Sequence, residues 1–225
     1  APVPFLLFRS DVTRRDDTVA SLLQRLGVSD SEAAAFLRRE PQAAELFKGR
    51  AGKLVMAETG DAQRLQRLTA RWLPNEDSAT YQRLLVERTE QGLQARLETA
   101  DFTTSVRLSS GVIRSSLFAA TDAANIPDSV AVQLAEMFSS DIDFRRDLRQ
   151  GDRFTVVYES LEADGEPMTV GRVLSAEFVN GDKTFDAVWF EAPGHKGGYY
   201  NFAGESSRRF YLSSPLEFSR VSSGY

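Results

Sequence analysis

The spacing of apolar residues predicts helices in the first fifth of the chain. Apolar side chains recur every three or four residues over 19–26, which is typical of one face of a helix. Residues 16–18 offer side-chain acceptors for the start of that helix, and Gly27 can end it. A second helix is expected to begin at the Ser-Asp-Ser-Glu run of 29–32 and to end at Pro41.

The spacing then changes to two, which predicts strands. Segment 64–73 fits either a helix or a strand, and we favour a strand because the segments after it alternate. Residues 90–92 are expected to join two of these strands as a hairpin, with Gly92 supplying a positive φ. The expected strands of this part are 1–10 (or an extended arm), 53–57, 64–73, 81–89, 92–99 and 102–108.

Helical spacing returns between Gly111 and Asp152 and predicts a helical pair. The two helices are expected at about 112–125 and 128–140, with Asn125 in a left-handed cap and Asp128 as the next N-cap. The remaining pattern alternates again. It predicts a hairpin of 170–179 and 184–190 around Asn180-Gly181, and a last strand pair, Tyr199–Phe202 with Arg209–Leu212.

These elements predict an α+β protein of two small domains. Residues 74–78, Pro-Asn-Glu-Asp-Ser, combine turn formers with no apolar side chain and are the best linker. We therefore expect an N-terminal domain at 1–75 and a β-rich second domain at 76–225, braced by the helical pair. A chain of 225 residues has room for two such cores.

Composition narrows the possible functions. The net charge of −5 argues against a general nucleic-acid binder, which usually has a basic surplus, although local basic patches remain compatible with it. The absence of cysteine excludes disulfides and thiolate metal sites. The apolar run near the N-terminus, Val3 to Phe8, is far shorter than the roughly 20 residues of a membrane span.

Catalytic motifs are missing from the sequence. Its one histidine, His195, lies in a glycine-rich loop, whereas a zinc peptidase site needs about three protein ligands, usually with two histidines. No GxSxG turn accompanies His195, so a Ser-His-Asp site is not indicated either. We expect no catalytic residue, no metal ligand and no cofactor in this chain.

An acid–arginine cluster after the helical pair is the densest group of charges. It could be a metal or acid–base site, a contact for a partner, or an ionic joint that fixes the helix–strand junction. The Asp-x-Asp spacing lacks the glycine and terminal glutamate of a calcium loop, so we favour the joint. The predicted joint consists of Asp141, Asp143, Arg145, Arg146, Asp147, Arg149 and Asp152.

Two further groups have a binding interpretation beside a structural one. Asp17 and Thr18 could contact a glycan, but they also suit a helix cap, which is the commoner role. Aromatic side chains near the C-terminus could stack on sugar rings, but alternation would bury about half of them in a core. These aromatic residues are Tyr199, Tyr200, Phe202, Phe210 and Tyr211.

Several long motifs resemble one family. The runs GVIRSSLFAATDAANIPDSVAVQLAEMF and DIDFRRDLRQGDRFTVVYE resemble the region before the catalytic domain of Gram-negative LytM-type (lysostaphin-like) zinc murein endopeptidases. The resemblance extends over about 110–225, to the closing SSPLEFSRVSSGY. Upstream, VTRRDDTVASLLQRLGVSDSEAAAFL is similar to their LysM-like (OapA-like) first domain, although the family usually has Gly where Asp16 stands.

The resemblance implies a LysM-like βααβ domain followed by the β-rich domain. It also implies a non-catalytic region that restrains (autoinhibits) or positions a peptidoglycan DD-endopeptidase during cell-wall remodelling; the alternative is a peptidoglycan-binding targeting module. The implied partners are a LytM-type catalytic domain, in cis or as a separate chain, and peptidoglycan. Zinc would belong to that catalytic domain. The implied location is the periplasm, with any inner-membrane anchor outside this sequence.

Overall fold

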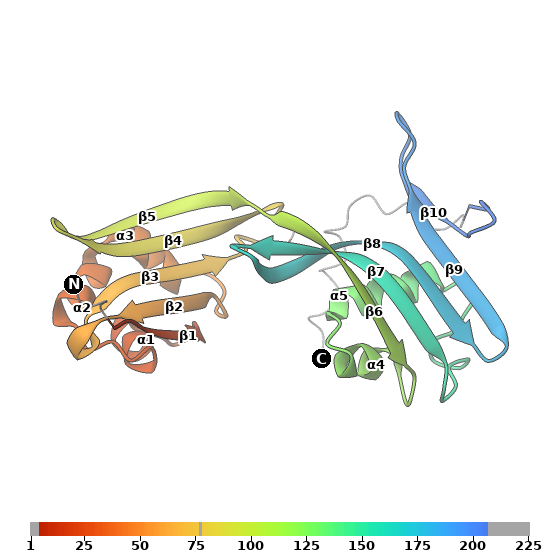
Figure 1. Ribbon diagram of the computed structural model, residues 1–225, viewed down its shortest axis with the longest axis horizontal. Helices are drawn as coiled ribbons and strands as arrows, with labels where there is room; N and C mark the ends of the chain where they lie inside the picture. The colour runs from red at the N-terminus through yellow and green to blue at the C-terminus, as the bar shows by residue number, and fades with distance from the viewer. Residues whose placement is uncertain (1–4, 77, 207–225) are drawn as a thin grey trace. The chain divides into compact units, whose positions relative to one another are not determined.

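The computed structural model describes residues 5–76 and 78–206, which form two compact units that divide after Asp101 (Figure 1). Each unit holds a five-stranded antiparallel sheet. The first unit contains β1 (Leu7–Val12), α1 (Val19–Arg25), α2 (Ser31–Arg39), α3 (Pro41–Ala44), η1 (Glu45–Phe47), β2 (Leu54–Thr59), η2 (Asp61–Gln63), β3 (Leu65–Trp72), β4 (Thr80–Thr89) and β5 (Gly92–Asp101).

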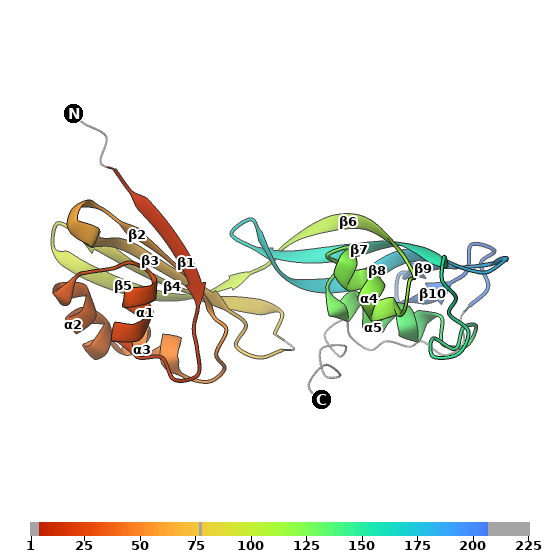
Figure 2. The same ribbon diagram turned by 90° about the horizontal axis from the view of Figure 1, so that it is seen from below.

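In the first unit the strands follow the order β1-β2-β3-β4-β5, and the three helices cover one face of the sheet (Figure 2). Alternate strand residues such as Ala57, Leu68 and Leu84 are fully buried beneath them, together with Leu22 of α1 and Leu37 of α2. Period-two alternation on the strands and helical spacing on α1 and α2 thus build one apolar core.

The opposite face of this sheet is polar and ion-paired. Arg67 reaches Glu87 at 2.9 Å across β3 and β4, and Arg83 reaches Glu98 at 2.8 Å across β4 and β5. Opposite charges on facing strands stabilise a sheet modestly while keeping its surface hydrated. The ambiguous segment 64–73 is therefore strand β3, as the alternation of its neighbours indicated.

The second unit has the strand order β10-β9-β8-β7-β6 and a pair of helices on one face. Its core includes Leu134, Phe138, Phe154 and Phe178, all at most 2% exposed. The elements are β6 (Thr103–Val112), α4 (Leu117–Ala123), α5 (Asp128–Met137), β7 (Arg153–Ala163), β8 (Glu166–Asn180), β9 (Lys183–Phe190) and β10 (Gly198–Tyr200).

The helical pair is present, with ends that differ from the prediction. Val112 belongs to β6 rather than to the first helix, and the second helix ends at Met137. Asn125 has the predicted left-handed backbone, with φ of 54°. Pro127 rather than Asp128 is the N-cap of α5. Within the predicted run 29–32, Asp30 caps α2 by accepting a hydrogen bond from the Ala33 amide.

The predicted domain boundary at 75/76 is wrong. It falls between β3 and β4, which pair in one sheet, so the turn-forming run at 74–78 belongs to a connection inside the first unit. The chain passes from one unit to the other between Asp101, the last residue of β5, and Thr103, the first of β6. Only Phe102 separates these strands, so no linker composition marks the true boundary.

Both sheets are antiparallel and the helices are few, so the protein is mostly β within an α+β arrangement. The first unit begins β1, α1, α2, then β2 after α3 and η1, and β1 pairs antiparallel with β2. This order agrees with a βααβ start, and its LysM-like character stays a prediction. The predicted strand 209–212 lies outside the described residues. No described helix is long and apolar enough to cross a membrane.

Candidate functional site

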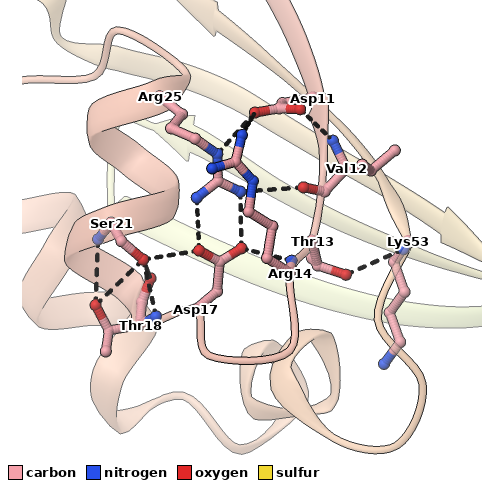
Figure 3. Close-up of polar contacts among 9 residues, drawn as sticks. All are labelled: Asp11, Val12, Thr13, Arg14, Asp17, Thr18, Ser21, Arg25 and Lys53. Carbon is pink, nitrogen blue, oxygen red and sulfur yellow. Dashed lines mark hydrogen bonds and ion pairs between the residues drawn. The ribbon is translucent and has the colours of Figure 1, made fainter.

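The loop between β1 and α1 carries the two predicted glycan residues, Asp17 and Thr18 (Figure 3). The Asp17 carboxylate accepts hydrogen bonds from both terminal nitrogens of Arg25, at 2.5 and 2.7 Å. The Ser21 hydroxyl donates to it at 2.8 Å, and so does the backbone amide of Arg14 at 2.8 Å. Its side chain is 4% exposed, so protein donors surround this carboxylate.

Thr18 is the N-cap of α1. Its hydroxyl accepts a hydrogen bond from the Ser21 amide at 3.2 Å, and the Ser21 hydroxyl accepts one from the Thr18 amide at 2.9 Å. This reciprocal pair is a capping box in which serine takes the place usually held by glutamate or glutamine. Helix amides that would lack a partner in the first turn are thereby satisfied.

Arg25 ties the end of α1 to β1. Its Nε donates to the Asp11 carboxylate at 2.7 Å, and Nη2 donates to the Val12 carbonyl at 3.0 Å. The hydrogen bonds from Arg25 hold the pKa of Asp17 well below its usual range and lower the pKa of Asp11 as well. The same two carboxylates raise the pKa of Arg25, so all three groups stay charged near neutral pH.

A second loop, between η1 and β2, is fastened to this one. The Lys53 amide donates to the Thr13 hydroxyl at 3.0 Å, and the Gly52 amide donates to the Thr13 carbonyl at 2.7 Å. The buried Lys53 ammonium donates to the carbonyls of Glu45 and Lys48 at 2.5 and 2.6 Å and lies 4.6 Å from the centre of the Trp72 ring. Its burial lowers the pKa of Lys53.

This cluster organises the loops, and its groups are committed to protein partners. The Asp17 carboxylate is paired, and the Thr18 hydroxyl caps a helix. General acid–base work requires a group with an accessible proton and a pKa near the working pH, which Asp17 lacks. The geometry gives Thr18 the capping role and Asp17 the ion pair with Arg25, and a glycan contact of either residue stays a prediction.

Asp152 is the centre of the predicted ionic joint. It is 4% exposed, and its oxygens accept hydrogen bonds from the amides of Arg149 and Gly181 at 2.8 and 2.9 Å. The Asn180 side chain donates to Asp152 at 2.7 Å and to the Asp147 carbonyl at 2.8 Å. These bonds hold the loop before β7 against the β8–β9 turn and lower the pKa of Asp152 against the effect of its desolvation.

The rest of the joint differs from the arginine–aspartate network that the sequence predicted. Asp143 accepts from the Arg145 amide, and Asp147 accepts from the Asp143 amide, both at 2.9 Å. Within this fully described stretch the one ion pair joins Arg146 to Asp143 at 3.8 Å, between exposed side chains. Asp141 is also exposed. The junction is thus held by carboxylates bound to backbone amides, which cap turns, rather than by salt bridges.

The described residues do not fit a zinc site. His195 is exposed, and residues 5–76 and 78–206 contain no group of three or more potential ligand side chains.

The aromatic candidates near the C-terminus divide into buried and exposed side chains, as alternation suggests. Tyr199 is buried and donates to the Val173 carbonyl at 2.7 Å, whereas Tyr200 is half-buried and Phe202 is 63% exposed. Residues 210 and 211 lie outside the described part.

No sequence pattern indicated the hollow of about 480 Å³ that the first unit contains. Residues from β1, α1, α2 and the turn between the helices line it. Two of them, Arg9 and Arg38, are cationic, and periodicity alone marks them only as solvent-facing positions of a strand and a helix. Their convergence depends on the tertiary fold, because 29 positions separate them in the chain.

Comparison with known proteins points to cell-wall peptidases. No protein-family model matches the chain. The peptidoglycan DD-endopeptidase ShyC of Vibrio cholerae is 30% identical over 145 residues, which are 64% of this chain and 33% of ShyC. The chain is therefore homologous to a peptidoglycan endopeptidase and spans about a third of the length of this relative.

Solved structures show weaker likeness. A zinc-containing peptidase from Vibrio cholerae has a TM-score of 0.44 and 19% identity, covering 88% of this chain and 58% of that one. Csd3 of Helicobacter pylori, in its hexagonal crystal, has a TM-score of 0.49 and 13% identity, covering 86% of this chain and 50% of that one.

Proposed function

We propose that the chain is a non-catalytic region that restrains or positions a zinc-dependent peptidoglycan DD-endopeptidase in the periplasm. The observation that carries this proposal is the 30% identity to ShyC over 145 residues. The sequence supports it because a single histidine is too few for the usual ligand set of a peptidase zinc site. Zinc, in this proposal, is held by the peptidase domain, and this chain acts on that domain.

Restraint in cis needs only a weak interface. Two linked domains meet at an effective concentration of about 1 mM, so a contact with millimolar affinity already occupies much of the population. Release of so weak a contact then costs less than about 1 kcal/mol. The two cores of this chain suit the role, because a domain that covers a cleft must keep its own shape without its partner.

The test is inhibition in trans. The peptidase domain of the same enzyme is assayed on purified sacculi while this chain is titrated to about 1 mM, with albumin as the protein control. We expect the rate of murein hydrolysis to fall with the concentration of the chain, and calorimetry to show matching binding. An unchanged rate together with no heat of binding would refute the inhibitory form of the proposal.

Targeting to peptidoglycan is the second candidate, favoured by the βααβ order and by the polar hollow between β1, α1 and α2. It predicts that the chain alone sediments with purified sacculi. Failure to sediment would exclude targeting and leave restraint untouched, so the two experiments separate the candidates.

A further inference from the structure

The hollow of the first unit combines an apolar floor with a polar rim. Leu23 of α1 and Val28 of the α1–α2 turn lie at its floor, 4% and 8% exposed, with Ala34 of α2 beside them. Hydroxyl and amide side chains on the rim include Ser31 and Gln63. A hollow of about 480 Å³ is of the size that small ligands occupy, with room for a few residues of peptide.

Arg9 reaches the hollow from the edge strand. It lies opposite Ala57 in the β1–β2 register, and Ala57 is fully buried under the helices, so Arg9 is on the helix-covered face of the sheet. Its guanidinium lies against the backbone of Gly27, where a Cβ would be only 2.7 Å from Nη1. Gly27 has φ of +67°, so glycine supplies both the turn and the space for Arg9.

The two arginines of the hollow have no acidic partner in the described part of the chain. Asp30 also lines it, but its carboxylate already accepts from the amides of Ala33 and Leu65 and from Arg88 at 2.7 Å. Among the described residues, neither Arg9 nor Arg38 forms an ion pair. The hollow therefore presents two uncommitted guanidinium groups beside a carboxylate that is already satisfied.

We propose that this hollow binds the C-terminal carboxylate of a short peptide with small apolar side chains. A guanidinium binds a carboxylate with two parallel hydrogen bonds, which makes arginine the preferred partner for this planar anion. The apolar floor suits methyl groups, and the rim offers partners for peptide amides. The choice of a peptide rests on the proposed function, because peptidoglycan carries short peptides.

The full chain is titrated with acetyl-D-Ala-D-Ala and with its C-terminal amide, and binding is followed by calorimetry and by NMR shifts. We expect the acid to bind at least about tenfold more tightly than the amide, the loss that follows from removing a charged hydrogen-bonding partner. Arg9→Gln and Arg38→Gln should each lower the affinity for the acid by about tenfold, for the same reason. Arg15→Gln makes the same charge change at an exposed position outside the hollow and should leave affinity unchanged.

Four results would overturn the site: no binding of the acid, equal binding of acid and amide, equal loss with Arg15→Gln, or displacement by an equal concentration of acetate. Near-UV circular dichroism of each variant shows whether the fold is kept. If the chain does not bind the peptide but inhibits the peptidase or sediments with sacculi, only the peptide site is refuted. If the chain binds the peptide but neither inhibits the peptidase nor sediments with sacculi, the proposed function is refuted.

Discussion

Replacing Asp17 by asparagine tests whether the cluster around Arg25 stabilises the first unit. Asparagine keeps the size of the side chain and removes its charge. In the native protein four donor atoms meet this carboxylate, two of them from Arg25. Arg25 would keep its bonds to Asp11 and to the Val12 carbonyl, so the cluster would lose one charged partner and not its whole framework.

The expected loss is about 2 kcal/mol in the free energy of unfolding at pH 7. A hydrogen bond to a charged group contributes about 1.5–3 kcal/mol. The asparagine oxygen has two lone pairs and can still accept two of the four bonds, so the loss is mainly that of the charge on the Arg25 pair. At a urea m-value of about 2 kcal/mol/M, the midpoint of unfolding should fall by about 1 M.

The difference should depend on pH. Because the folded pKa of Asp17 is depressed, its contribution is fully present above the unfolded pKa of about 3.9 and is lost as pH falls towards the folded value. Urea unfolding at pH 7, 5 and 3, followed by Trp72 fluorescence in a Trp189→Phe background, reports on the first unit. The urea midpoints of the native protein and of Asp17→Asn should differ by the same amount at pH 7 and pH 5 and approach each other at pH 3.

Asp16→Asn is the matched control, since it removes the same charge from the exposed neighbouring residue. Its free energy of unfolding should change by less than about 0.5 kcal/mol, as is usual for surface substitutions. Equal shifts for Asp16→Asn and Asp17→Asn would refute the reasoning, and so would a difference for Asp17→Asn that stays constant down to pH 3.

Three further substitutions test individual contacts. Gln133→Leu leaves two buried backbone groups of β8 without their side-chain partner, so the second unit should lose about 3 kcal/mol, measured by urea unfolding and Trp189 fluorescence. Gly197→Ala would place a Cβ 2.1 Å from the Trp189 ring and should lower the melting temperature, whereas Gly198→Ala, with 3.8 Å of clearance, should not. Lys53→Met removes the donor to two loop carbonyls and should lower the stability of the first unit by about 2 kcal/mol in the same urea assay; an unchanged midpoint would contradict this role.

Local patterns predicted most elements because each depends on near neighbours in the chain. Alternation located β3, and the Asn180-Gly181 hairpin occurs between β8 and β9, with Gly181 at φ of 62°. The domain boundary was missed for the opposite reason. Turn formers mark where a chain turns, and at 74–78 it turns within one sheet, whereas the passage from β5 to β6 is nearly continuous strand.

The candidate site divides in the same way. The cap at Thr18 follows from residue type and spacing, and the structure confirms that it starts α1. The pairing of Asp17 and Asp11 with Arg25 does not follow, because it joins residues 8 and 14 positions apart through the packing of α1 against β1. Similarly, the density of charges suggested salt bridges around Asp152, but its oxygens accept hydrogen bonds from backbone amides in tight turns instead.

Net charge and local charge lead to different conclusions about ligands. A net charge of −5 over 225 residues disfavours the binding of a long polyanion, because such a ligand contacts a large part of the protein surface. A single carboxylate interacts electrostatically only with groups within about one Debye length, roughly 8 Å at physiological salt. At that range, affinity for the carboxylate depends on which nearby arginines have no ion-pair partner in the protein. Four acids near the helices, Asp11, Asp17, Asp30 and Glu32, pair with Arg25 and Arg88. Among the described residues, Arg9 and Arg38 at the hollow have no ion-pair partner. An acidic chain can therefore hold a selective site for one small anion.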